Sequence, residues 1–193
     1  MISIRKIYPA DCGVWERVER LYADAFPRNE RRAESEMRRL AECGRLNVFA
    51  VVNPCAAEDA GGADGESDDC GGFCGFITWW DFGGFVYGEH FAMLPECRGA
   101  GIGGEVIDRF VAEAGKPVVL EVELPTNDMA RRRIGFYERH GFVLCDAEYA
   151  QPPYDAGGEC VPMRLMSHGM SLDAEAFERV RSILYAEVYG VAE

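Results

Sequence analysis

The sequence predicts one domain of the α/β (α+β) class, in which helices and strands do not simply alternate. Short runs rich in β-branched and aromatic residues indicate strands, and apolar residues spaced three and four apart indicate helices. In the middle of the chain, a strand, a glycine-rich loop, a helix and another strand form a βαβ unit. The 193 residues, 48% of them hydrophobic, suffice for one complete core, so we expect a single domain over residues 1–193.

Composition and charge argue against several classes of protein. The net charge of -13 argues against a nucleic-acid partner, because phosphate binding requires a basic surface. No apolar run approaches the roughly 18 to 20 residues that cross a bilayer, and the N-terminus lacks the apolar core of a signal peptide. The eight scattered cysteines and three histidines show no metal-ligand spacing. We therefore expect a cytoplasmic enzyme with reduced cysteines and no metal, membrane or nucleic-acid partner.

The first part of the chain predicts one strand followed by two helices. Residues 2–7 alternate apolar and polar side chains, which is typical of a strand. Asp11 is suited to cap a helix whose apolar residues lie on one stripe, and this helix should end near Phe26 and Pro27. A second, highly charged helix is expected over residues 30–43.

Three strands are expected next. Residues 46–52 and 73–80 are rich in β-branched and aromatic side chains and predict neighbouring strands. Between them, residues 53–72 contain six Asp and Glu residues, no Lys or Arg, and many glycines. This composition predicts a long, mobile acidic loop. The third strand covers residues 85–93.

The loop that follows this strand matches the dinucleotide-binding fingerprint. Four of its eight residues, CRGAGIGG at 97–104, are glycines. The fingerprint G-x-G-x-x-G places a pyrophosphate at a helix N-terminus and requires an acidic residue about 20 positions further on. The matching residues are Gly99, Gly101 and Gly104, with Glu121 or Glu123 as the acid.

The same loop also matches R-x-x-G-x-G, a signature of loops that hold the pyrophosphate of coenzyme A. Arg98, Gly101 and Gly103 occupy the fixed positions of this pattern. Glycines let backbone N–H groups approach an anion closely, and a helix that begins near Ile102 adds the positive end of its dipole. Arg98 would supply a positive charge at the entrance of the loop.

The surrounding chain favours the coenzyme A pattern. A dinucleotide fingerprint follows its strand directly and lies early in its domain, whereas here residues 94–98 separate the strand from the glycines. A P-loop is excluded because no Gly-Lys-Ser/Thr sequence follows. A Rossmann enzyme that binds NAD stays the alternative interpretation of these glycines.

The rest of the chain alternates helices and strands and ends in an extension. Gly135 lies inside the helix expected over residues 127–140. A glycine there costs about 1 kcal/mol relative to Ala, so we expect a close backbone contact at this position. The expected elements are a helix after Ile102, a strand over 118–124, a helix over 127–140 capped by Asn127, strands over 142–148 and 161–166, and a helix capped by Ser171.

Three segments in this order carry a resemblance to a known family. They are GEHFAMLPECRGAGIG at 88–103, LEVE at 120–123 and FYERHGF at 136–142. Together they resemble the GNAT superfamily of acetyl-CoA-dependent N-acetyltransferases. The resemblance implies a mixed, mostly antiparallel central sheet that splays between two strands and is flanked by helices. It covers roughly residues 1–150 and leaves a C-terminal strand and helix extension from about residue 150.

The resemblance also implies where acetyl-CoA binds. The strand over residues 85–93 would splay from the strand over 118–124, and the pantetheine arm would lie in the gap. Backbone groups of the first strand would pair with this arm, and the amides of the glycine loop would hold the pyrophosphate. The implied cofactor-binding residues are Phe91, Ala92, Met93, Arg98, Gly99, Ala100, Gly101, Ile102, Gly103, Gly104, Asn127 and Tyr137.

In such enzymes the acceptor amine attacks the thioester directly, so the site needs a base for the ammonium and an acid for the thiolate. By resemblance, Tyr137 matches the position of the acid. We expect Glu89 to be the base, with Glu121 and Glu123 as alternatives. His90 should point to the opposite face of the sheet from Glu89, because side chains alternate along a strand.

The acceptor side is less defined. The first two helices, the segment 26–32 between them and residues 151–154 would line it, and none of them names a substrate. Arg131, Arg132 and Arg133 would either reach the 3′-phosphate of CoA or form a solvated helix face. We expect a primary amine of a small molecule or peptide as acceptor, and the C-terminal strand and helix are suited to a homodimer. A non-catalytic acyl-CoA-binding module is the alternative of a different class.

Overall fold

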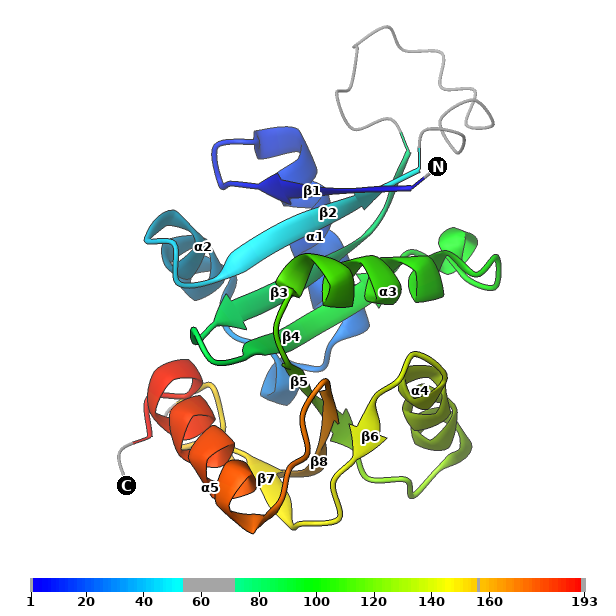
Figure 1. Cartoon of the computed structure of the whole chain (residues 1–193). Coiled ribbons are helices and arrows are strands. Elements are labelled where there is room, and N and C mark those ends of the chain that lie inside the picture. Colours follow the sequence, from blue (N-terminus) through cyan, green and yellow to red (C-terminus); the bar gives the residue numbers. More distant parts are fainter. Residues whose placement is uncertain (1, 54–71, 156, 192–193) are drawn as a thin grey trace, which may run out of the picture.

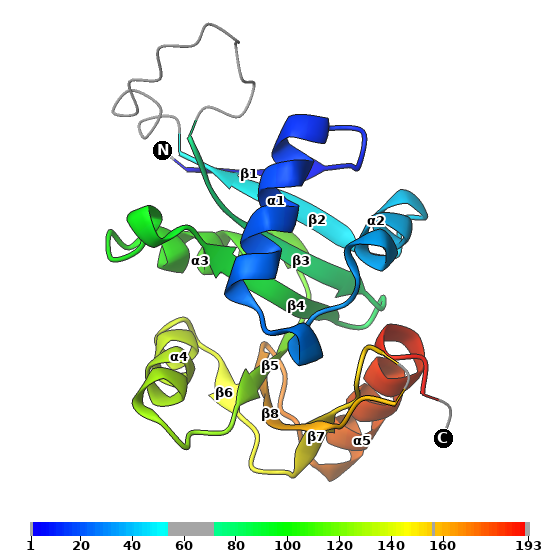
Figure 2. The same cartoon turned by 180° about the vertical axis from the view of Figure 1, so that it is seen from behind.

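A computed structural model describes residues 2–53, 72–155 and 157–191 of the chain. The acidic loop predicted over residues 53–72 lies outside the described residues, apart from its two ends. The described strands form one eight-stranded sheet. Helix α3 crosses one face of this sheet and helix α1 crosses the other (Figures 1 and 2).

The helices form where apolar side chains recur on one face and pack against the sheet. Among the described residues, five helices are α-helical, two short ones are 3-10 helices, and the segment after α5 is π-helical. Their bounds are α1 Cys12–Ala25, η1 Arg28–Glu30, α2 Glu34–Glu42, η3 Pro95–Cys97, α3 Ile102–Ala114, α4 Asp128–Arg139, α5 Ala174–Ile183 and η4 Leu184–Val188.

The sheet has the order β1-β2-β3-β4-β5-β8-β6, and β7 also pairs with β8. Only β4 and β5 are parallel, and the other neighbours are antiparallel. The predicted mixed, mostly antiparallel sheet is therefore confirmed. The strands are β1 Ser3–Ile7, β2 Asn47–Val52, β3 Phe73–Asp81, β4 Val86–Met93, β5 Val118–Glu123, β6 Val143–Leu144, β7 Tyr149–Gln151 and β8 Val161–His168.

Two large apolar clusters fill the two sides of the sheet. Trp15 of α1 and Leu40 of α2 share one cluster with Phe177 and Leu184 from the C-terminal extension. Helices α3 and α4 contribute to the other, which includes the buried Phe110. The C-terminal extension is thus part of the same core as the N-terminal helices, and it places β8 inside the sheet between β5 and β6.

Several element bounds differ from the sequence prediction. The helix expected over residues 30–43 begins only at Glu34, because the preceding residues form the short helix η1. The prediction of one strand over residues 142–148 is wrong. The chain instead pairs with β8 through two short strands, β6 inside this range and β7 after it. Asp11 does not cap α1, because its carboxylate accepts the backbone N–H of Tyr8 at 2.8 Å.

The predicted cap of α4 is confirmed and that of α5 is wrong. Asn127 Oδ1 accepts the N–H of Ala130 at 2.9 Å, which satisfies one free donor of the first turn of α4. For α5, the capping residue is Asp173, whose Oδ1 accepts the N–H of Ala176 at 2.9 Å. Ser171 lies before the helix begins. Both residues have capping side chains, so residue type alone did not distinguish them.

A β-bulge in β4 changes where two polar side chains point. Thr78 pairs with His90 and Trp79 pairs with Gly88, so Glu89 is an extra residue that has no partner in β3. At such a bulge the strict alternation of faces is lost. Glu89 Oε2 and His90 Nδ1 lie 3.6 Å apart, on the same face of the sheet. The expectation that they point to opposite faces is therefore wrong.

Candidate active site

The parallel strands β4 and β5 separate after a short paired segment, and we call this separation the fork. Residues 86–88 pair with residues 118–120, and the pairing then stops. Beyond this point β4 continues beside β3 alone, and β5 continues beside β8 alone. The predicted splay of the two strands is confirmed. Each strand presents unpaired backbone groups to the fork, as a ligand that pairs with a strand edge requires.

Residues 97–104, which we call the cradle, connect β4 to α3 at the open end of the fork. Gly99 and Gly101 have φ angles of 84° and 78°, which residues with a Cβ adopt at a cost. Gly101 also begins α3, and no side chain caps this helix. In the described part of the chain, the backbone N–H groups of residues 99–103 donate to no protein acceptor. Free donors at the N-terminus of a 13-residue helix are suited to an anion.

Arg98 ties the cradle to the end of β4. Its Nε donates to the carbonyl oxygen of Met93 at 3.0 Å, and its backbone N–H donates to Pro95 at 3.2 Å. The side chain is exposed, so the guanidinium lies at the surface beside the glycines. This position agrees with the predicted charge at the entrance of the loop, and the Met93 contact adds a positioning role.

The other two glycines of the cradle meet different neighbours. A Cβ on Gly104 would lie 2.8 Å from the ring of His140, which is closer than van der Waals contact allows. Gly104 therefore permits α3 to pack against the end of α4. A Cβ on Gly103 would meet Phe91 at an ordinary 3.7 Å. Gly135, where we expected a close backbone contact, would meet only the tip of the Arg139 side chain, so that expectation is wrong.

Glu89 lies at the start of the fork, and its carboxylate is fully buried. Its Oε1 accepts hydrogen bonds from Arg32 Nη2 at 2.5 Å, from Arg32 Nε at 3.1 Å and from the Tyr154 hydroxyl at 3.2 Å. Its Oε2 accepts no hydrogen bond from the described residues. The bulge aims this carboxylate at the segment between η1 and α2, which carries Arg32.

Arg32 is a buried cation between aromatic rings. Its guanidinium lies 4.6 Å from the ring centre of Tyr154 and 5.3 Å from that of Trp80. It also donates to the carbonyl oxygen of Val188, at the end of the chain, at 3.3 Å. The sequence placed Arg32 in the segment 26–32 expected on the acceptor side, but it did not predict the pairing with Glu89, because the ion pair joins residues far apart in sequence.

Burial alone would raise the pKa of Glu89, but the Arg32 guanidinium and His90 outweigh it. The net effect holds the pKa of Glu89 well below its usual range. In this arrangement the carboxylate is ionised and only weakly basic. The prediction that Glu89 is the catalytic base is not tested by this geometry and stays a prediction.

Glu121 is the first residue of β5 beyond the paired segment, so it lies opposite Glu89 across the fork. Its Oε1 accepts a short hydrogen bond from the hydroxyl of Tyr149. The hydroxyl of Tyr189 donates to both of its oxygens, at 3.0 and 2.8 Å, and lies 3.2 Å from the hydroxyl of Tyr87. Burial raises the pKa of Glu121, although these hydroxyls oppose the shift.

The third candidate carboxylate, Glu123, is nearer the surface. It forms an ion pair of 2.7 Å with Arg133 of α4, and both side chains are more than a third exposed. Burial raises the pKa of Glu30, and the nearby negative charge of Glu123 adds to this effect. Glu123 already has a cation as partner, which makes it a less suitable proton acceptor than Glu121.

Tyr137 lies on α4 among the rings of Phe136 and Phe142, at centroid distances of 5.2 and 5.6 Å. Its side chain packs with the apolar cluster that contains α3. Burial raises the pKa of Tyr137 to about 12, although the nearby Arg133 opposes the shift. A phenol with this pKa keeps its proton at neutral pH and is suited to donate it.

The three consecutive arginines of α4, residues 131–133, have different surroundings. Arg131 bonds to Asp128 at 2.6 Å and to the carbonyl oxygen of Pro125 at 2.9 Å. Arg133 is paired with Glu123. Arg132 is exposed. The described contacts therefore favour a solvated, paired helix face for two of them.

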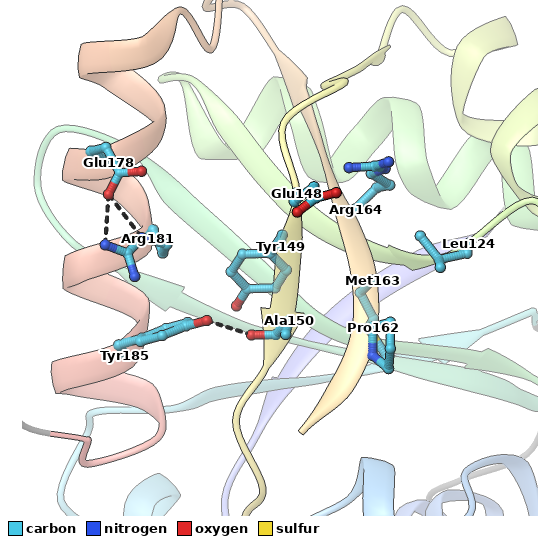
Figure 3. A pocket seen from close by; sticks show the side chains of 10 residues that line it. All are labelled: Leu124, Glu148, Tyr149, Ala150, Pro162, Met163, Arg164, Glu178, Arg181 and Tyr185. Carbon is cyan, nitrogen blue, oxygen red and sulfur yellow. Dashed lines mark hydrogen bonds and ion pairs between the residues drawn. The ribbon is translucent and has the colours of Figure 1, made fainter. Parts of the chain in front are cut away.

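In the described part of the chain, two cavities are lined by tyrosines whose hydroxyls bond to Glu89 or Glu121. The first has a volume of about 350 Å³ and lies between α2, the end of β3 and the last turn of the chain. The second, about 550 Å³, lies between β7, β8 and α5, where Tyr149 and Tyr185 line it (Figure 3). The first cavity, which we call the acceptor cavity, is lined by Arg32, Ala33, Glu36, Arg39, Leu40, Arg45, Trp80, Tyr154, Asp155, Ala186, Glu187, Val188, Tyr189 and Gly190.

The described residues also limit the kinds of site present. Among them, no group of three or more His, Cys, Asp or Glu side chains is placed to hold a metal ion. Within the same residues, no helix has the length and apolar character needed to cross a membrane.

The forked mixed sheet with its glycine-rich cradle is a GNAT-like fold, and the comparisons identify the family. A model of the acetyltransferase (GNAT) domain matches residues 56–144. The structure of an acetyltransferase assigned to the GNAT family from Bacteroides thetaiotaomicron is 37% identical, with a TM-score of 0.83. This match covers 98% of this chain and 99% of that chain. The chain therefore belongs to the GNAT family of acetyltransferases.

More distant structures share the fold. Arabidopsis thaliana NAA60 in complex with acetyl-CoA is 20% identical, with a TM-score of 0.63 over 87% of this chain and 98% of that chain. A variant of the Vibrio cholerae spermidine N-acetyltransferase is 12% identical, with a TM-score of 0.59 over 86% of this chain and 92% of that chain. A search of the curated proteins gives no match.

Proposed function

We propose that this chain is an acetyl-CoA-dependent N-acetyltransferase that transfers the acetyl group to a primary amine by direct attack. The observation that carries the proposal is the unused N–H groups of residues 99–103 at the open end of the fork. This arrangement offers a polyanion a binding site in a chain of net charge -13. Membership of the GNAT family supports acetyl-CoA as the donor.

The chain's own residues fit that donor. The cradle amides and the positive end of α3 would hold the pyrophosphate, and the unpaired edge of β4 from Phe91 to Met93 would bind the pantetheine arm. Arg98 would lie beside the phosphates. Asn127 and Tyr137, at the start and the last turn of α4, complete the set of proposed contacts.

The reaction requires two protons to leave the nitrogen. One passes from the ammonium to a protein base before attack. The C–N bond then forms, the C–S bond breaks, and Tyr137 gives its proton to the departing thiolate. The second proton of the nitrogen restores Tyr137 and balances this loss. Tyr137 is suited to this role because its pKa of about 12 keeps the phenol protonated at neutral pH.

The acceptor binds on the side of the fork that carries the carboxylates. Glu89 Oε2 is a buried acceptor without a donor among the described residues, so we propose that it contacts the acceptor ammonium. The sequence points to Glu89 as the base, but its pairing with Arg32 holds its pKa low, so we assign Glu89 to binding of the ammonium and the proton to another group. The acceptor is a small molecule or a peptide with a primary amine, and the acceptor cavity of about 350 Å³ admits one such group.

Ligand binding and turnover test the proposal separately. Thermal shift is measured with CoA, acetyl-CoA and NADH, and acetylated products are then sought by mass spectrometry across a panel of amines. Mass detection is preferred because the exposed cysteines Cys12, Cys43 and Cys160 would react with thiol reagents. We expect stabilisation by CoA and acetyl-CoA, and transfer to at least one amine. Binding of CoA without transfer would instead support the non-catalytic module, and stabilisation by NADH alone would support the Rossmann alternative.

A further inference from the structure

The start of the fork carries two carboxylates in corresponding positions. The paired segment ends at Gly88 on β4 and at Leu120 on β5, so Glu89 and Glu121 each come next in their strands. Both carboxylates interact with the hydroxyls of tyrosines from the C-terminal extension, Tyr154 and Tyr189. The two strands thus bring two acidic groups together at the point where they separate.

The two carboxylates have different partners. Glu89 accepts from the Arg32 guanidinium, which is a permanent cation with little exposure. The described donors to Glu121 are uncharged, since they are the hydroxyls of Tyr149 and Tyr189. A buried carboxylate without a cation binds a proton more readily than one in an ion pair. Glu121 is therefore the more basic of the two groups.

Tyr189 connects Glu121 to the acceptor cavity. Its side chain lines that cavity, whereas Glu121 does not. Its hydroxyl hydrogen points to Glu121, and the hydroxyl of Tyr87 is its other neighbour, at 3.2 Å. The phenolic oxygen of Tyr189 has two lone pairs, so it can also accept a hydrogen bond from a donor in the cavity. Tyr185 lies one helical turn earlier, but its hydroxyl donates to the carbonyl oxygen of Ala150 instead.

We propose that Glu121 accepts the proton of the acceptor ammonium and that the hydroxyl of Tyr189 relays it. The ammonium gives a proton to the Tyr189 oxygen while the Tyr189 hydroxyl gives its own proton to a Glu121 oxygen. The free amine then attacks as described above, and Glu121 releases the proton to solvent once the product has left. The inference rests on the proposed function and assigns the C-terminal extension a place in its chemistry.

This relay has a consequence for pH dependence. Burial raises the pKa of Glu121, and the negative charge of Glu89 adds to the effect, while the hydroxyls of Tyr87, Tyr149 and Tyr189 oppose it. Activity should therefore rise with pH as Glu121 loses its proton, above the ordinary range of a glutamate. The Tyr189 hydroxyl stabilises the ionised form of Glu121. Its removal should therefore raise the pKa of Glu121 further and shift the ascending limb of any remaining activity to higher pH.

The experiment compares Glu121→Gln, Tyr189→Phe and the matched control Tyr185→Phe with the wild type. For each, kcat/KM is measured against pH with an amine that the wild type acetylates, and acetyl-CoA affinity is measured by calorimetry. We expect the first two variants to bind acetyl-CoA normally and to lose about 100-fold or more in kcat/KM. Glu121→Gln should also lose the ascending limb of the pH profile, and Tyr185→Phe should match the wild type.

Two results would overturn the relay. One is a Glu121→Gln variant that keeps the ascending limb and the rate of the wild type. The other is a Tyr189→Phe variant whose rate and pH profile equal those of Tyr185→Phe. Failure of the proposed function has a different signature, because the wild type itself would then acetylate no amine.

Discussion

The two sides of the fork are built in different ways. The cradle consists of backbone atoms from consecutive residues, 97–104, and two of its glycines have positive φ angles. The acceptor side consists of side chains from distant segments: Arg32 lies 57 residues from Glu89, and Tyr189 lies 68 residues from Glu121. Substitutions on the acceptor side can therefore change the acceptor amine while the local cradle stays unchanged. Each prediction below perturbs one side and asks whether the other responds.

The largest expected effect comes from breaking the buried ion pair of the acceptor side. Arg32→Met would leave the Glu89 carboxylate buried without its cation, which typically costs about 3–5 kcal/mol of stability. Denaturant unfolding at pH 7 measures this loss. The matched control is Arg45→Met, whose pair with Glu187 is about half exposed and should contribute less than about 1 kcal/mol.

The pH dependence of the same variant identifies Glu89 as the cause. In the wild type the pKa of Glu89 is held low, so its contribution to stability is present above about pH 4.3 and is lost as the pH falls. Without Arg32, burial raises the pKa of Glu89, and the carboxyl is protonated in acid at little cost. The difference between the two proteins should therefore shrink below about pH 4. A double variant with Glu89→Leu that recovered no stability would refute this explanation.

Tyr137→Phe perturbs the donor side of the chemistry without disturbing the packing. The ring stays among Phe136 and Phe142, so the fold and acetyl-CoA affinity should be unchanged. Loss of the proton donor should lower kcat by about 100-fold, the lower end of the usual range for general acids. Steady-state kinetics with calorimetry of acetyl-CoA binding measures both. An unchanged kcat would remove Tyr137 from the mechanism.

A pair of glycine variants isolates the binding role of the cradle. Gly101 and Gly83 have φ angles of 78° and 76°, and a Cβ at either position meets no atom within 4 Å. Replacement by Ala should cost each variant a similar ~1–2 kcal/mol of stability, since L-residues are strained there. Only Gly101→Ala should weaken acetyl-CoA binding, by about tenfold, because relief of the strained φ angle would turn the cradle N–H groups away from the phosphates, and a hydrogen bond to a charged group contributes about 1.5–3 kcal/mol. Equal affinities would show that the cradle amides do not hold the cofactor.

The sequence alone was sufficient to predict the elements around the cradle. The strand β4, the cradle and α3 are close together in the chain, separated only by the short helix η3, so local residue types and spacing carry the signal. The family resemblance predicted that β4 splays from β5, and the observed strand register confirms this prediction. The capping role of Asn127 is equally local, because its partner Ala130 lies three residues away.

The segments of the acceptor side were predicted, but its contacts could not be, because they form only in the tertiary structure. The bulge that turns Glu89 and His90 to one face depends on how β3 pairs with β4, which no property of β4 alone reveals. The pairing of Arg32 with Glu89 and that of Tyr189 with Glu121 depend on where α2 and the C-terminal extension pack. One signal was available: Glu121 lies between the apolar residues Leu120 and Val122 of β5, and a charged residue among such neighbours needs a partner.

The smallest effect tests whether the C-terminal extension supports the acceptor side through its helix. Asp173→Ala removes the cap of α5 and should cost about 1 kcal/mol, as typical N-caps do, whereas Ser171→Ala should be neutral. Because α5 leads directly into the turn before Tyr189, fraying of α5 also bears on the tyrosine that bonds to Glu121. Denaturant unfolding measures the first effect, and the pH profile of kcat/KM measures the second. If the cap serves folding alone, Asp173→Ala lowers stability and leaves the pH profile unchanged; a shifted profile would show that α5 positions Tyr189 for catalysis.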